Sequence, residues 1–321
     1  MTQVAVINVS APYDNLGAQK LRDWLGMQGA QVTYHDGDPG LFGGWPDQVW
    51  LSVIFSWDAP CACDLALRYR AQADVLCGGP GMFALAAWWQ RETGLPCHRG
   101  LDWRFERQRG VYSMTFASRG CPVDCSFCIV PRLEGTTFTL DWDFVPAPIL
   151  CDNNLSALPV AFQEHIVRRY HETETPLRDA NSGFEPATFD EGTYHRWHPL
   201  LKGPWRLAFD TWEEAPAVQR MLQILAKEPA RRKQVYVLMG NEPIAACYER
   251  AQQVIAWGGE PYVQPLLPLN ALRRDAYKIA YDWDGPRLRA MQRYYNRHVW
   301  RTIPLRAYRQ PRSAAPLFAQ L

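Results

Sequence analysis

Three cysteines stand close together in the segment SRGCPVDCSFCIVP, residues 118–131. They are Cys121, Cys125 and Cys128, with the spacing C-x3-C-x2-C. Thiolates are soft ligands that select iron–sulfur clusters, zinc or copper(I). No fourth cysteine lies nearby, whereas a structural zinc site is usually closed by four ligands. Three thiolates on a [4Fe–4S] cluster leave one iron open to a substrate or cofactor, and the segment is therefore predicted to bind such a cluster.

The cysteine segment follows a predicted strand, Val111–Phe116, and so forms a loop at that strand's carboxyl end. Active sites of βα barrels are built on that face. Helical stretches such as 217–226 and 244–257 alternate with five further predicted strands, at 148–150, 177–179, 206–209, 234–239 and 261–263. Six βα repeats are too few for an eight-fold barrel, so a partial, open barrel is expected.

The first third of the chain also alternates between strands and helices. Its predicted strands are 4–9, 31–35, 48–55 and 74–77, and its predicted helices are 16–27 and 64–73. This alternation favours a parallel, Rossmann-like sheet with right-handed crossovers. A polar segment, Gln90–Gly110, is expected to be irregular and to hold the boundary. The predicted domains are 1–108, 109–268 and 269–321.

The cysteine spacing, with Phe127 before the last cysteine, resembles the radical S-adenosylmethionine (SAM) superfamily. In that superfamily the open iron binds the amino and carboxylate groups of SAM. One electron then cleaves SAM to methionine and a 5′-deoxyadenosyl radical, which abstracts hydrogen from a substrate. Seven other segments resemble a compact group of the B12-binding class whose substrate is unassigned: DNLGAQKL (14–21), GGPG (78–81), CDNNLSA (151–157), NSGFEP (181–186), RLAFD (206–210), VYVLMG (235–240) and PYVQP (261–265).

The resemblance implies an α/β chain. It consists of a Rossmann-like, cobalamin-binding-like domain, a partial (β/α)6 radical SAM barrel and a basic C-terminal helical tail. It also implies SAM contacts where the barrel strands end, at Asp152, Asn153, Asn154, Asn181, Ser182, Glu185, Asp210, Gly240 and Asn241. Asp and Asn side chains can accept a hydrogen bond from the ammonium of SAM.

Alternatives remain open for several of these positions. An Asx-turn would also explain the residues after Cys151, and that thiol could instead act in substrate chemistry. Glu185 could face the substrate, and Asp210 could cap a loop. Arg119, beside the first cysteine, is expected to bond a loop carbonyl rather than to lie near the cluster.

The N-terminal domain departs from the cobalamin-binding pattern. The axial-histidine signature Asp-x-His-x-x-Gly is absent, and the nearest text is Tyr13-Asp14-Asn15-Leu16-Gly17. His35 lies after the second predicted strand, at its carboxyl end, which is the wrong place for the axial ligand. We therefore expect a degenerate domain that caps the barrel or shapes the substrate cleft, with cobalamin binding as the alternative.

The other cysteines share no metal-ligand spacing. A buried thiol behaves as a small apolar residue. We expect that role for Cys61, Cys63, Cys77, Cys97 and Cys247.

The end of the chain is basic and aromatic. From Ala271 onward there are eleven Lys or Arg against three Asp, a net charge of +8. Arginine neutralises phosphate and aromatics stack on unpaired bases, so nucleic acid is a conceivable partner of Arg287–Arg312. The favoured alternative is an amphipathic helix whose aromatics pack on the barrel while its arginines are solvated.

The whole chain has 321 residues and a formal net charge of +1. This near-neutral charge does not point to a particular class of binding partner. It has no apolar run of about 20 residues and no secretory signal, so a cytoplasmic protein without a membrane partner is expected. The predicted function is a radical SAM enzyme that acts on an unidentified substrate and receives electrons from a donor such as flavodoxin or ferredoxin. The alternatives are a cobalamin-dependent radical SAM methyltransferase and a nucleic-acid-binding protein with structural zinc completed by His98.

Overall fold

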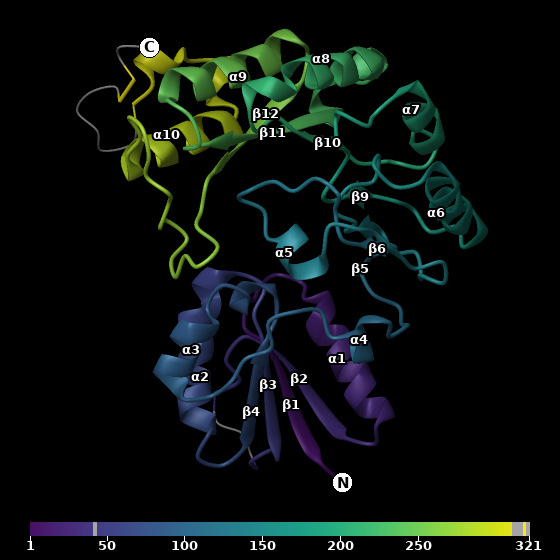
Figure 1. Ribbon diagram of the computed structural model, residues 1–321, viewed down its shortest axis with the longest axis vertical. Coiled ribbons are helices and arrows are strands. Elements are labelled where there is room, and N and C mark those ends of the chain that lie inside the picture. Colours follow the sequence, from purple (N-terminus) through teal and green to yellow (C-terminus); the bar gives the residue numbers. More distant parts are fainter. Residues whose placement is uncertain (41–43, 310–316, 319–321) are drawn as a thin grey trace. The chain divides into compact units, whose positions relative to one another are not determined.

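The computed structural model describes residues 1–40, 44–309 and 317–318 (Figure 1). It divides into two compact units. Unit 1 comprises Met1–Ala147 and Leu269–Arg274, and unit 2 comprises Pro148–Pro268 and Asp275–Leu321. The division falls after Ala147, whereas the domain boundary drawn from the sequence lies at residue 108. No helix among the described residues is long and apolar enough to cross a membrane.

The first part of unit 1 is a parallel four-stranded sheet with helices on both faces. Its strands pair in the order β2-β1-β3-β4. The elements are β1 (Gln3–Asn8), α1 (Leu16–Met27), β2 (Gln31–Asp36), β3 (Gln48–Ser52), α2 (Ala59–Tyr69), β4 (Asp74–Gly78) and α3 (Ala86–Thr93). The predicted Rossmann-like sheet is therefore present, and each of its four strands lies within a few residues of its predicted bounds.

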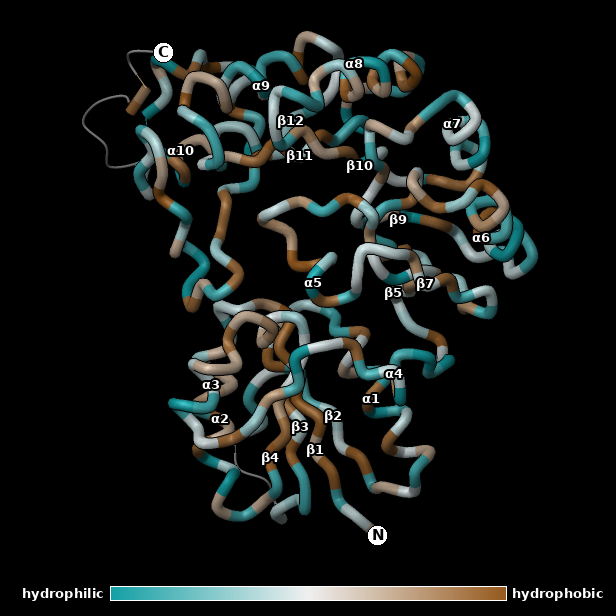
Figure 2. The backbone as a smooth tube through the Cα atoms, viewed as in Figure 1, coloured by the Kyte–Doolittle hydropathy of each residue, from teal (hydrophilic) through white to brown (hydrophobic). Residues whose placement is uncertain are grey.

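Strand β1 is hydrophobic along most of its length because both faces are covered (Figure 2). Val4 and Val6 pack against α1, while Ala5 and Ile7 belong to the core under α2 and α3. This alternation follows from the two-residue repeat of a strand. Helix α1 begins where Asn15 accepts a hydrogen bond from the Ala18 backbone N–H at 3.0 Å.

Two local predictions in this region were wrong. Helix α2 begins at Ala59 rather than at residue 64, because Pro60 occupies its first turn, where a missing N–H costs no helical hydrogen bond. The segment 90–110 is not uniformly irregular. It contains the end of α3 and a short helix, α4 (Trp103–Glu106), which begins at an Asp102 cap.

The rest of unit 1 carries the cysteine segment. Its elements are β5 (Met114–Thr115), β6 (Ser118–Arg119), α5 (Val130–Glu134) and β7 (Thr139–Leu140). Strands β6 and β7 pair antiparallel, and the cysteines lie on the connection between them. Residues 269–274 complete the unit, since Leu272 packs on the sheet core and Arg274 lies over the rings of Tyr13 and Trp57.

Unit 2 continues the alternation of parallel strands and helices. Its elements are β8 (Ile149–Leu150), α6 (Val160–Glu172), β9 (Asp179–Ala180), α7 (Glu191–Trp197), β10 (Trp205–Ala208), α8 (Ala215–Ile224), β11 (Lys233–Met239), α9 (Ile244–Ala256), β12 (Glu260–Pro265) and α10 (Gly285–Asn296). Strands β8 and β9 pair in parallel, as do β10, β11 and β12. Each of the five strands predicted between residues 148 and 263 is present.

The described part of the tail packs through its aromatic residues. Tyr294 and Tyr295 of α10 are buried, and Asn296 bonds the backbone of Val263 in β12 through both its amide oxygen and nitrogen. The helix ends at Asn296, and His298 takes a left-handed conformation with φ of 55°. Only Arg293 lies within α10, so Arg293, Arg297 and Arg301 do not share one helical face. Residues 310–312 of the predicted basic segment lie outside the described residues.

Candidate functional site

The three cysteines of the predicted cluster lie on an irregular loop of unit 1. Cys121 is buried, and Cys125 and Cys128 are partly buried. The backbone turns back on itself here, with the Cys128 N–H donating to the Cys125 carbonyl at 2.9 Å. The Val130 N–H donates to the Cys128 sulfur at 3.4 Å. Three cysteines at this spacing are the donor set that a [4Fe–4S] cluster with one open iron takes.

A cubane cluster does not require its ligands to meet at one point, because each thiolate binds a different iron. Among the described residues, no three Cys, His, Asp or Glu side chains converge as ligands of a single ion.

The loop is closed at its base by close backbone contact. Gly120 has φ of +90°, and a Cβ atom on it would lie 2.2 Å from the carbonyl oxygen of Thr137. Only glycine fits such an approach without moving the backbone. The Gly120 N–H donates to the Glu134 carboxylate at 2.9 Å, and the Cys121 N–H donates to the Gly135 carbonyl at 3.2 Å. Both ends of the cysteine loop are therefore tied to each other.

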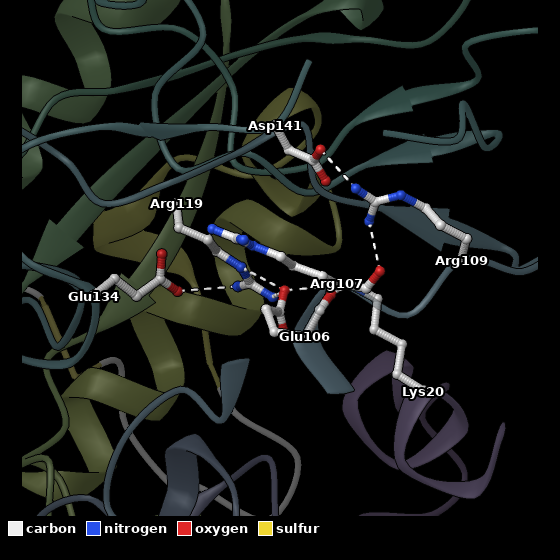
Figure 3. A network of polar contacts seen from close by, with 7 residues as sticks. All are labelled: Lys20, Glu106, Arg107, Arg109, Arg119, Glu134 and Asp141. Atoms are coloured by element: carbon white, nitrogen blue, oxygen red, sulfur yellow. Dashed lines mark hydrogen bonds and ion pairs between the residues drawn. The ribbon is translucent and has the colours of Figure 1, made fainter. Parts of the chain in front are cut away.

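Arg119 lies in an ionic network and not, as predicted from the sequence, on a loop carbonyl (Figure 3). Its guanidinium bonds Glu106 of α4 at 2.9 Å and Glu134 of α5 at 3.1 Å, and it lies over the Phe116 ring. Lys20 of α1 reaches the same Glu106 carboxylate at 3.3 Å. Burial lowers the pKa of Lys20, and the negative charge of Glu106 opposes that shift. Sequence reasoning missed Glu106, Glu134 and Lys20 because nothing local distinguishes them from surface charges.

The nine residues predicted to contact SAM all lie in unit 2, at the carboxyl ends of its strands. After β8, Asp152 is fully buried and Asn154 is nearly so. The Asn154 side chain accepts from the Ala157 N–H at 3.2 Å, which is the turn-closing role given as its alternative. After β9, Asn181 and Ser182 are exposed, and the Ser182 hydroxyl donates to the Cys151 carbonyl at 3.4 Å. The loops after β8 and β9 are thereby brought together.

The loop after β9 is held in place by glycine and by aromatic packing. Gly183 has φ of +85°, and a Cβ atom there would lie 2.3 Å from the Arg206 carbonyl oxygen. The next residue, Phe184, packs against Phe189, Trp197 and Trp205 with ring centroids 5.1 to 5.6 Å apart. These contacts fix the direction in which the following residue, Glu185, leaves the core.

Three carboxyl groups meet where β9 and β10 end. Asp210 follows β10, and burial together with the negative charges of Glu214 and Glu185 raises its pKa to about 7, against the opposing charge of Arg250. Burial also raises the pKa of Glu214, which accepts from the Asp210 N–H at 2.6 Å. A carboxyl group in these surroundings is stabilised by an incoming cation such as an ammonium.

A buried arginine organises the strand ends on the other side of Asp210. Arg250 of α9 is fully buried and donates to the Phe209 carbonyl and, at 2.7 Å, to the Leu238 carbonyl. It also bonds the Asn241 side-chain oxygen at 3.2 Å, and the Asn241 amide donates to the Asp210 carbonyl at 2.6 Å. Asn241 thus bridges the ends of β10 and β11 directly after Gly240.

The fold is similar to that of a radical S-adenosylmethionine methyltransferase, TsrM, from Kitasatospora setae. Its structure with cobalamin and a [4Fe–4S] cluster matches with a TM-score of 0.61 and 15% identity, over 84% of this chain and 77% of that chain. Its structure with tryptophan substrate and a SAM analog, aza-SAM, matches with a TM-score of 0.59 and 15% identity, over 84% and 75%. The chain therefore shares the fold of this methyltransferase. No family model and no curated protein sequence matches.

This similarity confirms, at the level of fold, the resemblance predicted from the sequence. It does not support the expectation that cobalamin binding is the less favoured alternative, because the TsrM structure holds cobalamin. In the N-terminal sheet of this chain, polar side chains gather where the strands end. Asn8 bonds Asp36 at 2.9 Å, and Asn15 bonds Asn8 at 3.1 Å and Ser52 at 3.0 Å. Carboxyl ends of such sheets are where ligands of doubly wound folds bind.

The five cysteines outside the predicted cluster and its neighbouring loop follow the prediction with one exception. Cys63, Cys77 and Cys247 are buried, and Cys97 is partly buried. Burial raises the pKa of Cys77 well above its ordinary value, which makes that thiol unreactive. Cys61 is exposed, so its assignment to the core was wrong. It lies on the outer face of α2, where its neighbours Ala62 and Cys63 point inward.

Proposed function

We propose that this protein is a radical SAM enzyme that binds a [4Fe–4S] cluster through Cys121, Cys125 and Cys128. The observation that carries the proposal is a C-x3-C-x2-C loop, closed at its base, on a chain with the fold of radical SAM methyltransferases. When bound, the cluster supplies the electron that cleaves SAM reductively to a 5′-deoxyadenosyl radical. The hydrogen that this radical abstracts belongs to an unidentified substrate, and an electron donor such as flavodoxin or ferredoxin would serve the cluster.

The residues at the strand ends of unit 2 are proposed to hold SAM. Asp210 and Glu185 place negative charge where the ammonium of SAM would be bound, and ionised carboxylates are good acceptors for it. Asn181 and Ser182 are exposed and offer neutral polar groups to the ribose or the carboxylate. Gly240 lets the backbone after β11 approach a flat base closely.

The experiment is anaerobic reconstitution with iron and sulfide, followed by dithionite and SAM. We expect several irons per chain and release of 5′-deoxyadenosine, measured by liquid chromatography and mass spectrometry. Alanine at Cys121, Cys125 or Cys128 should abolish both. The matched control is Cys61→Ala, because Cys61 is exposed and lies in a different element. If an alanine variant of Cys121, Cys125 or Cys128 kept its full iron content and full SAM cleavage, the cluster assignment would be refuted.

Cobalamin-dependent methyl transfer is the second candidate function. The similarity to TsrM with cobalamin bound favours it, since it extends over 84% of this chain. The N-terminal sheet offers Asn8, Asn15 and Ser52 at its carboxyl ends, although their side chains are already bonded to one another. The test is gel filtration with hydroxocobalamin, with the corrin read by absorbance. Stoichiometric corrin that coelutes with the protein supports methyl transfer, and its failure to coelute favours hydrogen abstraction alone.

A further inference from the structure

Four charged side chains form a chain of ion pairs within unit 1 (Figure 3). Lys20 of α1 pairs with Glu106, Glu106 pairs with Arg119, and Arg119 pairs with Glu134. The side chains are 9%, 10%, 13% and 6% exposed, in the order Lys20, Glu106, Arg119, Glu134. Exposed ion pairs contribute little to folding stability. In a nearly buried set with two charges of each sign, however, removing one side chain leaves a neighbouring buried charge without its partner, which is costly.

The network holds the cysteine loop at both ends. Arg119 stands two residues before Cys121, and Glu134 is the last residue of the helix that follows the loop. One oxygen of Glu134 accepts from Arg119 at 3.1 Å, and the other accepts from the Gly120 N–H at 2.9 Å. A single carboxylate therefore joins the residue that enters the loop to the residue that leaves it.

The same network ties the loop to the Rossmann-like sheet. Lys20 lies on α1, which packs on Val4 and Val6 of that sheet. Its ammonium bonds both the side chain and the backbone carbonyl of Glu106. The path from the sheet to the loop therefore runs through one lysine, one short helix and one arginine.

We infer that Arg119 and Glu134 are positioning residues for the iron–sulfur cluster, and that Lys20 and Glu106 anchor them to the N-terminal sheet. This inference rests on the proposed function. A ligand loop whose ends are fixed keeps its thiolates in place when an iron dissociates transiently, so rebinding outcompetes loss. The N-terminal domain then serves cluster retention, whether or not it also binds cobalamin.

The test measures how fast the reconstituted protein loses iron to an excess of a ferrous chelator under anaerobic conditions. Glu134→Gln keeps the size of the side chain but removes its charge, and Lys20→Met breaks the distant end of the network. We expect iron loss to accelerate about 10- to 100-fold in Glu134→Gln, the usual effect of losing an outer-shell partner, and less in Lys20→Met. Arg119→Lys keeps the charge and should rescue most of the retention that Arg119→Met loses.

The matched control is Arg104→Gln, which removes an exposed ion pair with Asp102 from the same helix, α4. Circular dichroism melting of each iron-free variant separates loss of positioning from failure to fold. If Arg119→Met does not fold, iron loss is measured on Arg119→Lys instead. The electron paramagnetic resonance spectrum of the reduced cluster should shift in Glu134→Gln and not in Arg104→Gln. Wild-type rates of iron loss and an unchanged spectrum in Glu134→Gln would overturn the inference. Wild-type protein that takes up no cluster would instead overturn the proposed function.

Discussion

Replacing Asp210 with asparagine is expected to stabilise the protein at alkaline pH and not at acidic pH. Burial removes water from the Asp210 carboxyl, and the negative charges of Glu214 and Glu185 repel its ionised form. Together these effects raise the pKa of Asp210 from 3.8 to about 7. A folded-state pKa above the unfolded value means that the fold favours the protonated form. Stability from this group is therefore fully present below about pH 4 and is lost as the pH rises through 7.

The size of the effect follows from the shift. About three pKa units correspond to roughly 4 kcal/mol, since one unit is about 1.4 kcal/mol. Asp210 is partly exposed, so solvent screening reduces this to about 2–4 kcal/mol. Asparagine has the same shape and carries no charge, and it removes the penalty. For a chain of this size we expect a gain of about 3–6 °C in melting temperature at pH 8 and almost none at pH 4.

Differential scanning calorimetry of both proteins between pH 4 and pH 8 measures this difference directly. The control is Glu213→Gln, because Glu213 is exposed and lies three residues from the same carboxyl group. The difference between wild type and Asp210→Asn should grow with pH, while the Glu213→Gln difference should stay flat. The same variant should bind SAM more weakly if Asp210 holds the ammonium. A difference in melting temperature that did not change with pH would refute the electrostatic reasoning.

The other predictions concern the loops, the buried arginine and the tail. Gly183→Ala should cost about 3 kcal/mol in urea unfolding because its Cβ would meet the Arg206 carbonyl, whereas Gly192→Ala in helix α7 should cost nothing. Arg250→Met should lower the free energy of unfolding by about 3–5 kcal/mol, since it leaves buried carbonyl oxygens without a donor; a loss under 1 kcal/mol would contradict this. Because the tail tyrosines are buried, we expect the wild-type protein to show no salt-dependent RNA binding in fluorescence anisotropy. Replacing Arg293, Arg297 and Arg301 with glutamine should then change neither RNA binding nor the melting temperature. RNA affinity that falls steeply with salt, and less steeply in this variant, would support nucleic acid as the partner.

Local sequence pattern was sufficient for most elements of the fold. The helix at Leu16–Met27 was predicted with its observed bounds, because a spaced apolar face and a terminal glycine are both local signals. Strands such as β11 (Lys233–Met239) were found for a similar reason, since buried parallel strands are continuous apolar runs. Helix α2 was placed too late because the proline in its first turn was not taken as a start signal.

The sequence by itself determined which residues could bind a cluster, since the three cysteines and their spacing are written in one short segment. Only the tertiary structure decided what holds that segment. Glu106, Glu134 and Lys20 come from separate elements, and pairing between residues far apart in the chain leaves no local pattern. The same holds for Arg250, whose burial beneath the ends of β10 and β11 distinguishes it from the exposed arginines nearby. An ionic side chain is structural or solvated according to its burial, and burial is a property of the folded chain.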